Sequence, residues 1–338
     1  MKNTAIVGAT GAVGRTMLSI LEERDFPVAE LRLLASSRTA GTKVETRWGE
    51  VEVEDLATAD PAGVEIALFS AGGDRSKEYG PKFAGAGAVV IDNSSAFRME
   101  PSVPLVVVDV NDADAANRPR GIIANPNCTT MAIMMAAGPL HRAAGLRMMI
   151  ATSYQSVSGS GMKGIEEMLR QNDALRPNAS GLQSGAWEDP GSEVYARPIG
   201  FNVLPLAGTL KDENYTDEEW KLVNETRKIL GSDSILVEPT CVRVPVVVSH
   251  GIAATMWFDR AIGHDEVVEL LEAAPGVQVW EETVPTPLDA AGADDVLVGR
   301  IRETVGERGG ISLWAVGDNL RKGAALNAVQ IAELVVTD

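Results

Sequence analysis

The stretch that decides the fold lies near the amino terminus and reads Thr4-Ala5-Ile6-Val7-Gly8-Ala9-Thr10-Gly11-Ala12-Val13-Gly14. Its first four residues predict a buried strand, and the apolar periodicity of residues 15–23 predicts a helix after the glycines. Glycines permit a tight turn and let a dinucleotide pyrophosphate approach backbone N–H groups at the helix start. The spacing is G-x-x-G-x-x-G rather than G-x-G-x-x-G, so a purely structural turn remains the alternative.

A second strand is predicted over residues 31–35, and it ends in Ser36-Ser37-Arg38. An NAD-binding fold usually offers an acidic residue to the ribose hydroxyls at this point. Two hydroxyls and a guanidinium suit a 2′-phosphate better, so NADP(H) is the expected cofactor. A solvated loop with a chance arginine is the alternative.

The rest of the chain predicts two domains, as the length of 338 residues also suggests. Strands over 65–70, 88–92 and 105–108, with a helix starting near Asp74, continue an α/β, doubly wound sheet of the Rossmann type. From Thr129 the pattern becomes α+β. Its predicted strands are 148–155, 242–248, 252–258, 296–301 and 311–316, and a helix is predicted over 318–334.

Composition excludes several classes of protein. Hydrophobic residues make up 45% and charged residues 23%, and no apolar run approaches the roughly 20 residues that cross a bilayer. The net charge of −17 disfavours nucleic acid and anionic membranes as partners. Cys128 and Cys241 form neither a disulfide framework nor a zinc spacing, so we expect no metal and a reducing cytoplasm.

Cys128 is the candidate nucleophile. It stands in Asn125-Pro126-Asn127-Cys128-Thr129-Thr130, directly before the apolar run 131–137, so a helix is predicted to begin at the sulfur. Backbone N–H groups at a helix start stabilise a thiolate. A buried core cysteine is the competing interpretation, and it is the one that we keep for Cys241.

Seven motifs together resemble the aspartate-β-semialdehyde dehydrogenase family over nearly the whole chain. They are GATGAVG (8–14), SSR (36–38), NSSAFRM (93–99), NPNCTT (125–130), SYQSVSGSG (153–161), CVRVPVVVSHG (241–251) and DNLRKGAALNAVQIAE (318–333). The resemblance implies NADP-dependent, reversible reductive dephosphorylation of L-aspartyl 4-phosphate to L-aspartate 4-semialdehyde through a Cys128 thioester. This reaction serves biosynthesis of the aspartate family of amino acids: lysine and diaminopimelate, threonine and methionine.

The resemblance also implies roles for individual residues. For the chemistry, His250 would be the acid/base, Gln155 would orient the acyl intermediate, and Asn127 would donate to the oxyanion or phosphate. For binding, Arg98 and Lys221 would contact the phosphate. Arg243 would clamp the substrate carboxylate, and Glu218 would hold the substrate amino group. Cofactor contacts would come from Gly8, Thr10, Gly11, Ala12, Val13, Ser36, Ser37, Arg38, Ser70, Gly72 and Asn319.

Structural alternatives stay open for several of these residues. Gln155 or Asn127 could cap a turn, and Glu218 with Lys221 could form an ordinary i, i+3 ion pair. Glu219 is predicted to close a capping box with Thr216. Arg243 and His250 stand seven positions apart, which would place them on opposite faces of one regular strand unless Pro245 breaks it.

From the resemblance we expect an NADP-binding domain of residues 1–128 and 318–338, and a catalytic and dimerisation domain of residues 129–317. The expected assembly is a homodimer, with a tetramer as the alternative. Two rival functions remain: an acyl-phosphate reductase similar to N-acetyl-γ-glutamyl-phosphate reductase, and a non-catalytic NADP-sensing protein.

Overall fold

The computed structural model describes residues 1–337 and divides into two compact units. The first unit comprises Met1–Gly138, Asn224–Asp233 and the chain from Leu320 onward, and the second comprises Pro139–Val223 and Ser234–Asn319. This division differs from the expected domains because residues 129–138 and 224–233 join the first unit, and 318–319 join the second. Sequence patterns mark where a helix begins, but they do not show which core it packs on.

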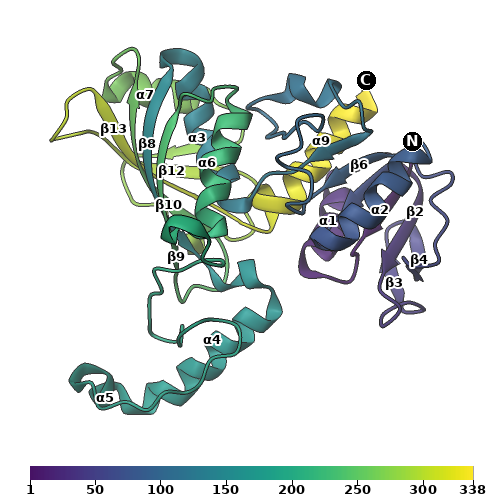
Figure 1. The fold of residues 1–338 in the computed structure, drawn as a ribbon, viewed down its shortest axis with the longest axis horizontal. Helices are drawn as coiled ribbons and strands as arrows, with labels where there is room; N and C mark the ends of the chain where they lie inside the picture. The colour runs from purple at the N-terminus through teal and green to yellow at the C-terminus, as the bar shows by residue number, and fades with distance from the viewer. Residues whose placement is uncertain (338) are drawn as a thin grey trace. The chain divides into compact units, whose positions relative to one another are not determined.

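The first unit contains a seven-stranded sheet in the order β3-β4-β2-β1-β5-β6-β7 (Figure 1). Its elements are β1 (Lys2–Val7), α1 (Ala12–Glu23), β2 (Val28–Ala35), β3 (Lys43–Thr46), β4 (Gly49–Asp55), β5 (Ile66–Phe69), α2 (Gly73–Gly85), β6 (Val89–Asp92), η1 (Asp112–Ala116), β7 (Ile122–Ala124), η5 (Arg321–Ala325) and α9 (Leu326–Thr337). All neighbouring pairs are parallel except β3 with β4. The strand order reverses between β1 and β5, which is where such sheets bind ligands.

The glycine turn sits at this reversal and requires glycine. Gly8 has φ +90°, and a Cβ on it would lie 2.3 Å from the carbonyl oxygen of Ser70 at the end of β5. A Cβ on Gly14 would lie 2.2 Å from the carbonyl oxygen of Gly8. The turn therefore packs backbone directly against backbone.

The carboxyl-terminal helix α9 completes the core of the first unit. Val329 and Ile331 of α9 belong to one buried cluster with Met17 and Ile20 of α1 and Ile6 of β1. Helix α9 is thus part of the core of this sheet, although its periodicity alone does not say where it packs.

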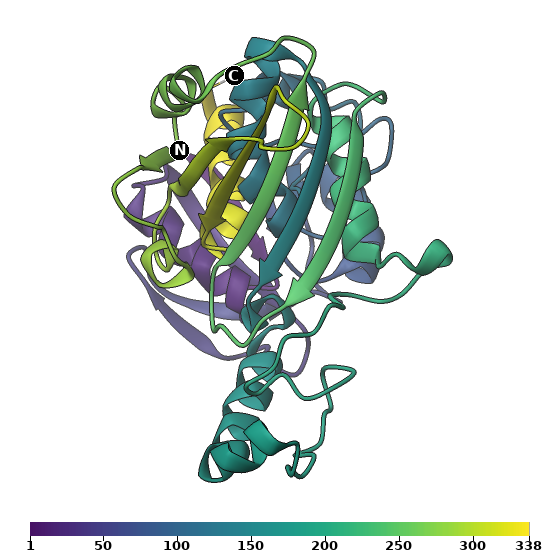
Figure 2. The same ribbon diagram turned by 90° about the vertical axis from the view of Figure 1, so that its left-hand side faces the viewer.

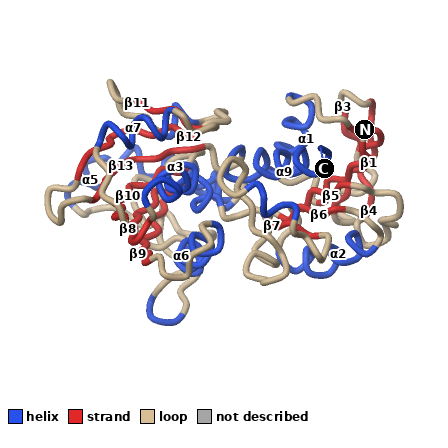
Figure 3. Tube along the Cα trace, turned by 90° about the horizontal axis from the view of Figure 1, so that it is seen from above, coloured by secondary structure: helices blue, strands red, loops and turns tan. Residues whose placement is uncertain are grey.

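The second unit is built on a six-stranded sheet in the order β11-β12-β13-β10-β8-β9, whose strands lie side by side in Figure 2. Its elements are β8 (Leu146–Gln155), η2 (Val157–Ser160), α4 (Met162–Leu175), η3 (Arg176–Asn178), α5 (Ala179–Ser184), η4 (Asp212–Asn214), β9 (Leu236–Arg243), β10 (His250–Phe258), α7 (His264–Glu272), β11 (Val277–Trp280), α8 (Pro287–Ala290), β12 (Val296–Glu303) and β13 (Gly310–Gly317). Helix α7 lies against β11 and β12 (Figure 3), while α4 and α5 extend away from the sheet (Figure 1). Helices α3 (Cys128–Ala144) and α6 (Asp217–Ile229) contain residues of both units.

Two predicted strands are wrong. Residues 105–108 form no strand, because the N–H groups of Val107 and Val108 bond to the side chains of Asn111 and Asn327, and β7 takes the place beside β6. The predicted strand 242–248 is instead the end of β9, which stops at Arg243 before Pro245, a residue without an N–H for pairing.

The predicted helix over 318–334 begins later than expected, with a π-helical turn over Arg321–Ala325 before α9. No helix in residues 1–337 combines the length and apolar character needed to cross a membrane.

Replacing Gly14 by Ala is expected to lower the free energy of unfolding by about 3 kcal/mol, because the new methyl group would overlap backbone atoms that cannot move aside. The measurement is urea unfolding followed by circular dichroism. Gly73→Ala is the matched control, since nothing lies within 4 Å of its Cβ position, and it should change stability by no more than about 0.5 kcal/mol. Equal stabilities of the two variants would contradict the close packing of the turn.

Candidate active site

The turn before α3 carries Cys128. Helix α3 begins at Cys128, as predicted, and the thiol residue is half-buried. The Oδ1 atom of Asn127 accepts the Thr129 N–H at 2.9 Å, so Asn127 caps the helix. The capping alternative for Asn127 is therefore what the structure shows, and its contact with a substrate stays a prediction.

The carboxylate of Glu225, in α6, holds this turn. Its Oε2 accepts the Asn127 N–H at 2.7 Å, and its Oε1 accepts a bond of 3.0 Å from Nη1 of Arg98. Arg98 also donates from Nε to the Asn125 carbonyl at 2.9 Å and from Nη2 to the Asn93 carbonyl at 2.8 Å. Arg98 is thus a buried residue with three protein partners. Sequence reasoning missed Glu225 because no local pattern marks it.

The Asn125 side chain is hydrogen-bonded to Asn327 of α9 and to the segment just before this helix. Asn327 donates to Asn125 Oδ1 at 2.6 Å, and Asn125 donates to the Ala324 carbonyl at 3.1 Å. The turn is therefore fixed by polar side chains from segments that are far apart in the chain.

A second group of residues lies at one end of the six-stranded sheet. Gln155, the last residue of β8, is paired with His250 of β10 on one side and with Arg243 of β9 on the other. Directly paired residues project to the same face of a sheet. Arg243 and His250 therefore share a face because they lie on different strands, and their odd spacing presents no obstacle.

His250 is fully buried, and its hydrogen bonds define its protonation. The Ser156 N–H donates to Nδ1 at 3.1 Å, so Nδ1 is an acceptor and the proton of the neutral ring lies on Nε2. Nε2 has no hydrogen-bond partner among residues 1–337. Burial, together with the charge of Arg243, lowers the pKa of His250 to about 3, so the ring is neutral at physiological pH.

Arg243 is a buried cation with few partners. Its Nη1 donates to the Ser156 carbonyl at 2.7 Å, its guanidinium lies 5.9 Å from the centre of the Tyr195 ring, and its Nε finds no acceptor within the described chain. A Cβ on Gly159 would lie 3.0 Å from Nη1 of Arg243 and 3.4 Å from Nε2 of His250. Gly159 thus marks the place where the two side chains converge.

Asn319 supports the same group from the end of β13. Its Oδ1 accepts bonds from Ser249 N at 2.8 Å, Ser158 Oγ at 3.0 Å and Ser156 Oγ at 3.2 Å. The side-chain carbonyl is therefore committed to the protein. Its proposed contact with the nicotinamide stays a prediction.

The start of α6 carries Glu218 and Lys221. Lys221 donates to Glu218 at 2.6 Å and to Asp217 at 2.7 Å, so the ion-pair alternative is present. Burial opposes the charge of Lys221, but the two carboxylates outweigh it and raise the pKa of Lys221. The predicted capping box is confirmed: Glu219 Oε2 accepts the Thr216 N–H at 2.7 Å, and Thr216 Oγ1 accepts the Glu219 N–H at 3.2 Å.

A cavity of about 170 Å³ opens beside the glycine turn. It is lined by Gly8, Thr10, Gly11, Ala35, Ser36, Arg38, Leu56, Ser70, Ala71 and Arg75. Two arginines and no carboxylate face it, which suits a phosphorylated ribose. Sequence reasoning missed Ala35, Leu56, Ala71 and Arg75, although Arg75 stands in the first turn of α2, shortly after β5. The expected contacts Ala12, Val13, Ser37 and Gly72 do not line this cavity.

The remaining candidates are structural. Burial raises the pKa of the Cys241 thiol to about 12, so this residue stays protonated. His141 accepts the Leu146 N–H at 2.9 Å, and His264 pairs with Asp265 and Glu281. Within residues 1–337 no cluster of His, Cys, Asp and Glu could hold a metal ion.

The structure thus assembles the predicted residues in separate groups. Arg98, Asn127 and Cys128 belong to the first unit together with the cofactor cavity, and Gln155, Glu218, Lys221, Arg243, His250 and Asn319 belong to the second.

Comparisons with known proteins agree along the whole chain. Residues 3–118 match the family model described as "Semialdehyde dehydrogenase, NAD binding domain", and residues 138–322 match "Semialdehyde dehydrogenase, dimerisation domain". An aspartate-semialdehyde dehydrogenase of Streptomyces akiyoshiensis is 53% identical over 98% of each chain, and one of Corynebacterium glutamicum is 51% identical over 99% of this chain and 100% of its own. Aspartate semialdehyde dehydrogenase II of Vibrio cholerae, solved also in complex with ASA, superposes with a TM-score of 0.94 at 45% identity, over 100% of this chain and 99% of that one.

Iodoacetamide is expected to alkylate Cys128 and not Cys241 in the folded protein near pH 8, because Cys241 is buried and its pKa of about 12 leaves almost no thiolate. Peptide mass spectrometry reads out the labelled residue. After unfolding in urea both residues should react, which controls for detection of the Cys241 peptide. Labelling of Cys241 in the folded protein at the rate of Cys128 would refute the assignment.

Proposed function

The chain belongs to the aspartate-semialdehyde dehydrogenase family, and on this premise we propose that it reduces L-aspartyl 4-phosphate to L-aspartate 4-semialdehyde, reversibly, with NADP(H). The reaction serves the biosynthesis of lysine and diaminopimelate, threonine and methionine. One observation carries the assignment of the site: Nε of Arg243 and Nε2 of His250 are buried donors without partners in the described chain, and the two side chains converge beside Gly159. Unpaired buried donors of this kind fit an anionic, carbonyl-bearing substrate.

The cofactor cavity fits a dinucleotide with a 2′-phosphate. The N–H groups of Ala9 and Gly11 are bonded to the carbonyls of Leu34 and Gly8, so the pyrophosphate would meet the start of α1. Ser36, Arg38 and Arg75 offer donors to the phosphorylated ribose. Reduced NADP supplies a hydride when it is bound. The proposed contacts of Ala12, Val13, Ser37, Gly72 and Asn319 would extend beyond the cavity lining.

Cys128 is the proposed nucleophile. Its thiolate adds to the acyl carbonyl, phosphate leaves, and a thioester forms on the sulfur. A thioester accepts hydride more readily than a carboxylate does, and collapse of the resulting hemithioacetal returns the aldehyde and the thiolate. The helix start at Cys128 would stabilise the thiolate both before it attacks the acyl carbonyl and after the hemithioacetal collapses.

His250 is proposed as the acid/base residue, and in its neutral form it offers the Nε2–H as a donor. Because Nδ1 accepts the Ser156 N–H, Nε2 carries the proton, and it has no hydrogen-bond partner among residues 1–337. In this tautomer the Nε2–H can donate to a developing oxyanion, while the ring lone pair, on Nδ1, accepts the Ser156 N–H. Gln155 would orient the acyl group, and its pairing with both His250 and Arg243 supports this role.

The family resemblance assigns substrate recognition to charged residues. Arg243 would clamp the substrate carboxylate and Glu218 the amino group, while Lys221, Arg98 and Asn127 would contact the phosphate. Lys221 must share its charge with Asp217 and Glu218 in this role. Recognition of a free amine favours this substrate over its N-acetylated glutamate counterpart.

The assembly and location are proposed on the same premise. The match of residues 138–322 to a dimerisation domain supports a homodimer, and a tetramer is the alternative assembly. The net charge of −17 supports the absence of nucleic-acid partners. A biosynthetic reaction and a thiol nucleophile suit the cytoplasm.

Cys128→Ala should abolish phosphate-dependent NADPH formation from aspartate semialdehyde while NADP binding, followed by fluorescence titration, is retained. Retained activity would refute the thioester route, and it would leave a non-catalytic or different function. In the same assay the wild-type protein should prefer aspartate semialdehyde to N-acetylglutamate semialdehyde, and the opposite preference would favour the rival reductase.

His250 makes stability depend on pH. Its pKa is about 3 in the folded protein and about 6.5 when unfolded, so between these values the unfolded chain binds more protons and stability falls as the pH falls. From pH 7 to pH 5 this contribution should remove about 2 kcal/mol from the free energy of unfolding. Urea unfolding of wild-type protein and His250→Asn at both pH values measures it. Equal losses in the two proteins would show that His250 is not buried in its neutral form.

A further inference from the structure

One buried carboxylate joins the turn before Cys128 to Arg98. Glu225 is 1% exposed and Arg98 is 7% exposed, and the two form an ion pair of 3.0 Å. The second oxygen of Glu225 accepts the Asn127 N–H at 2.7 Å. Charges buried to this extent are retained only where they are paired and hydrogen-bonded, so the turn depends on both members of the pair.

Arg98 is engaged before any anion arrives. Its bonds to the carbonyls of Asn125 and Asn93 hold the guanidinium on two further sides. A planar group bound in this way cannot swing towards a ligand without leaving Glu225 unpaired. The pair therefore first positions the segment 125–127, whatever contact Arg98 makes with phosphate.

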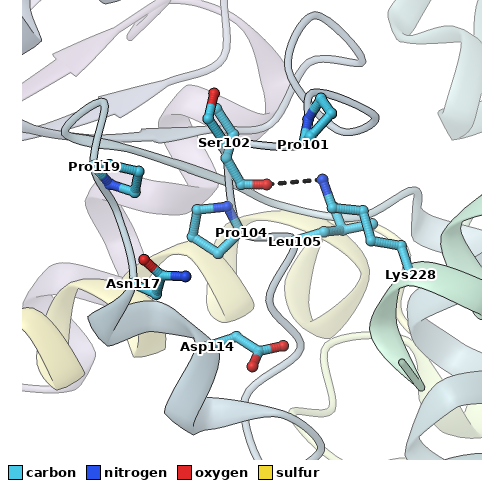
Figure 4. Close-up of a pocket in the computed structure, with 9 residues that line it drawn as sticks. Pro101, Ser102, Pro104, Leu105, Asp114, Asn117, Pro119 and Lys228 are labelled. Atoms are coloured by element: carbon cyan, nitrogen blue, oxygen red, sulfur yellow. Dashed lines mark hydrogen bonds between the residues drawn. The ribbon is translucent and has the colours of Figure 1, made fainter. Parts of the chain in front are cut away.

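Lys228, three residues after Glu225, anchors the neighbouring loop separately. Its amine donates to the carbonyls of Arg98 at 2.6 Å, Glu100 at 2.8 Å and Val103 at 2.8 Å. Figure 4 shows the bond of this amine to the Val103 carbonyl, between Ser102 and Pro104, at the edge of a cavity of about 230 Å³. Because Lys228 holds the loop, the carboxylate of Glu225 is available to the turn itself.

From these contacts we propose that Glu225 is a positioning residue for Cys128, and that its charge balances Arg98 so that the thiol does not experience an unopposed cation. The proposal rests on the proposed role of Cys128 as nucleophile. Two effects are combined in one side chain: a bond to the Asn127 N–H that fixes the turn, and a negative charge that offsets the guanidinium.

Glu225→Gln tests the charge of Glu225 through the pH midpoint of Cys128 alkylation, a readout that a loss of stability alone would not move. The amide keeps the size but loses the charge, so Arg98 becomes an uncompensated cation near the turn and favours the thiolate. The pH midpoint of Cys128 alkylation by iodoacetamide should move down by about one unit, and kcat should fall about tenfold or more as the turn loses its register. Glu225→Asp keeps the charge and withdraws the oxygens, so kcat should fall without that downward shift.

Thr226→Val is the matched control. Thr226 is a fully buried neighbour on α6 whose hydroxyl has no partner in the described chain, and a near-isosteric change should leave kcat and the alkylation midpoint as in the wild type. An unshifted midpoint in Glu225→Gln overturns the proposal, whether kcat is retained or falls together with the melting temperature. An active Cys128→Ala would instead refute the proposed function, so the two failures are distinguishable.

Discussion

The register of three strands at Gln155 is the constraint on which the candidate site depends. Because β8 pairs with β9 and β10 at this residue, Arg243 and His250 project to one face from separate strands. A slip of one residue in either pairing would turn one of these side chains to the opposite face. The Ser156 backbone then uses both of its groups, since its N–H binds His250 and its carbonyl binds Arg243. The arrangement of the candidate site residues therefore follows from the register of these three strands.

Charge balance distinguishes the arginines of this acidic chain. Arg98 is neutralised by Glu225 and bonded to two carbonyls, whereas Arg243 has a carbonyl, an aromatic ring and no carboxylate partner in the described residues. A buried cation lacking a counter-ion is costly unless a ligand completes it. This difference supports the proposed role of Arg243 at the substrate carboxylate, and it supports the proposed role of the Arg98–Glu225 pair in holding the turn that carries Cys128.

Local patterns predicted well the elements that depend only on interactions between residues close together in the chain. The glycine turn, the helix that begins at Cys128 and the Thr216–Glu219 capping box each depend on residues a few positions apart. Prediction failed where distant groups decided. Residues 105–108 have the composition of a strand, but side chains of Asn111 and Asn327 take their N–H groups. Glu225 could not be found because its partners, Arg98 and Asn127, are about a hundred or more residues away in the chain.

The sequence by itself determined the dinucleotide-binding turn, the nucleophilic cysteine at a helix start and the family, because steric limits on glycine and the field of a helix terminus act over a few residues. Only the tertiary structure decided that Arg243 and His250 share a face, that the proton of His250 lies on Nε2, and that Arg98 is balanced by Glu225. These properties arise from hydrogen bonds and ion pairs between segments that are distant in sequence, and such contacts exist only once the sheets have formed.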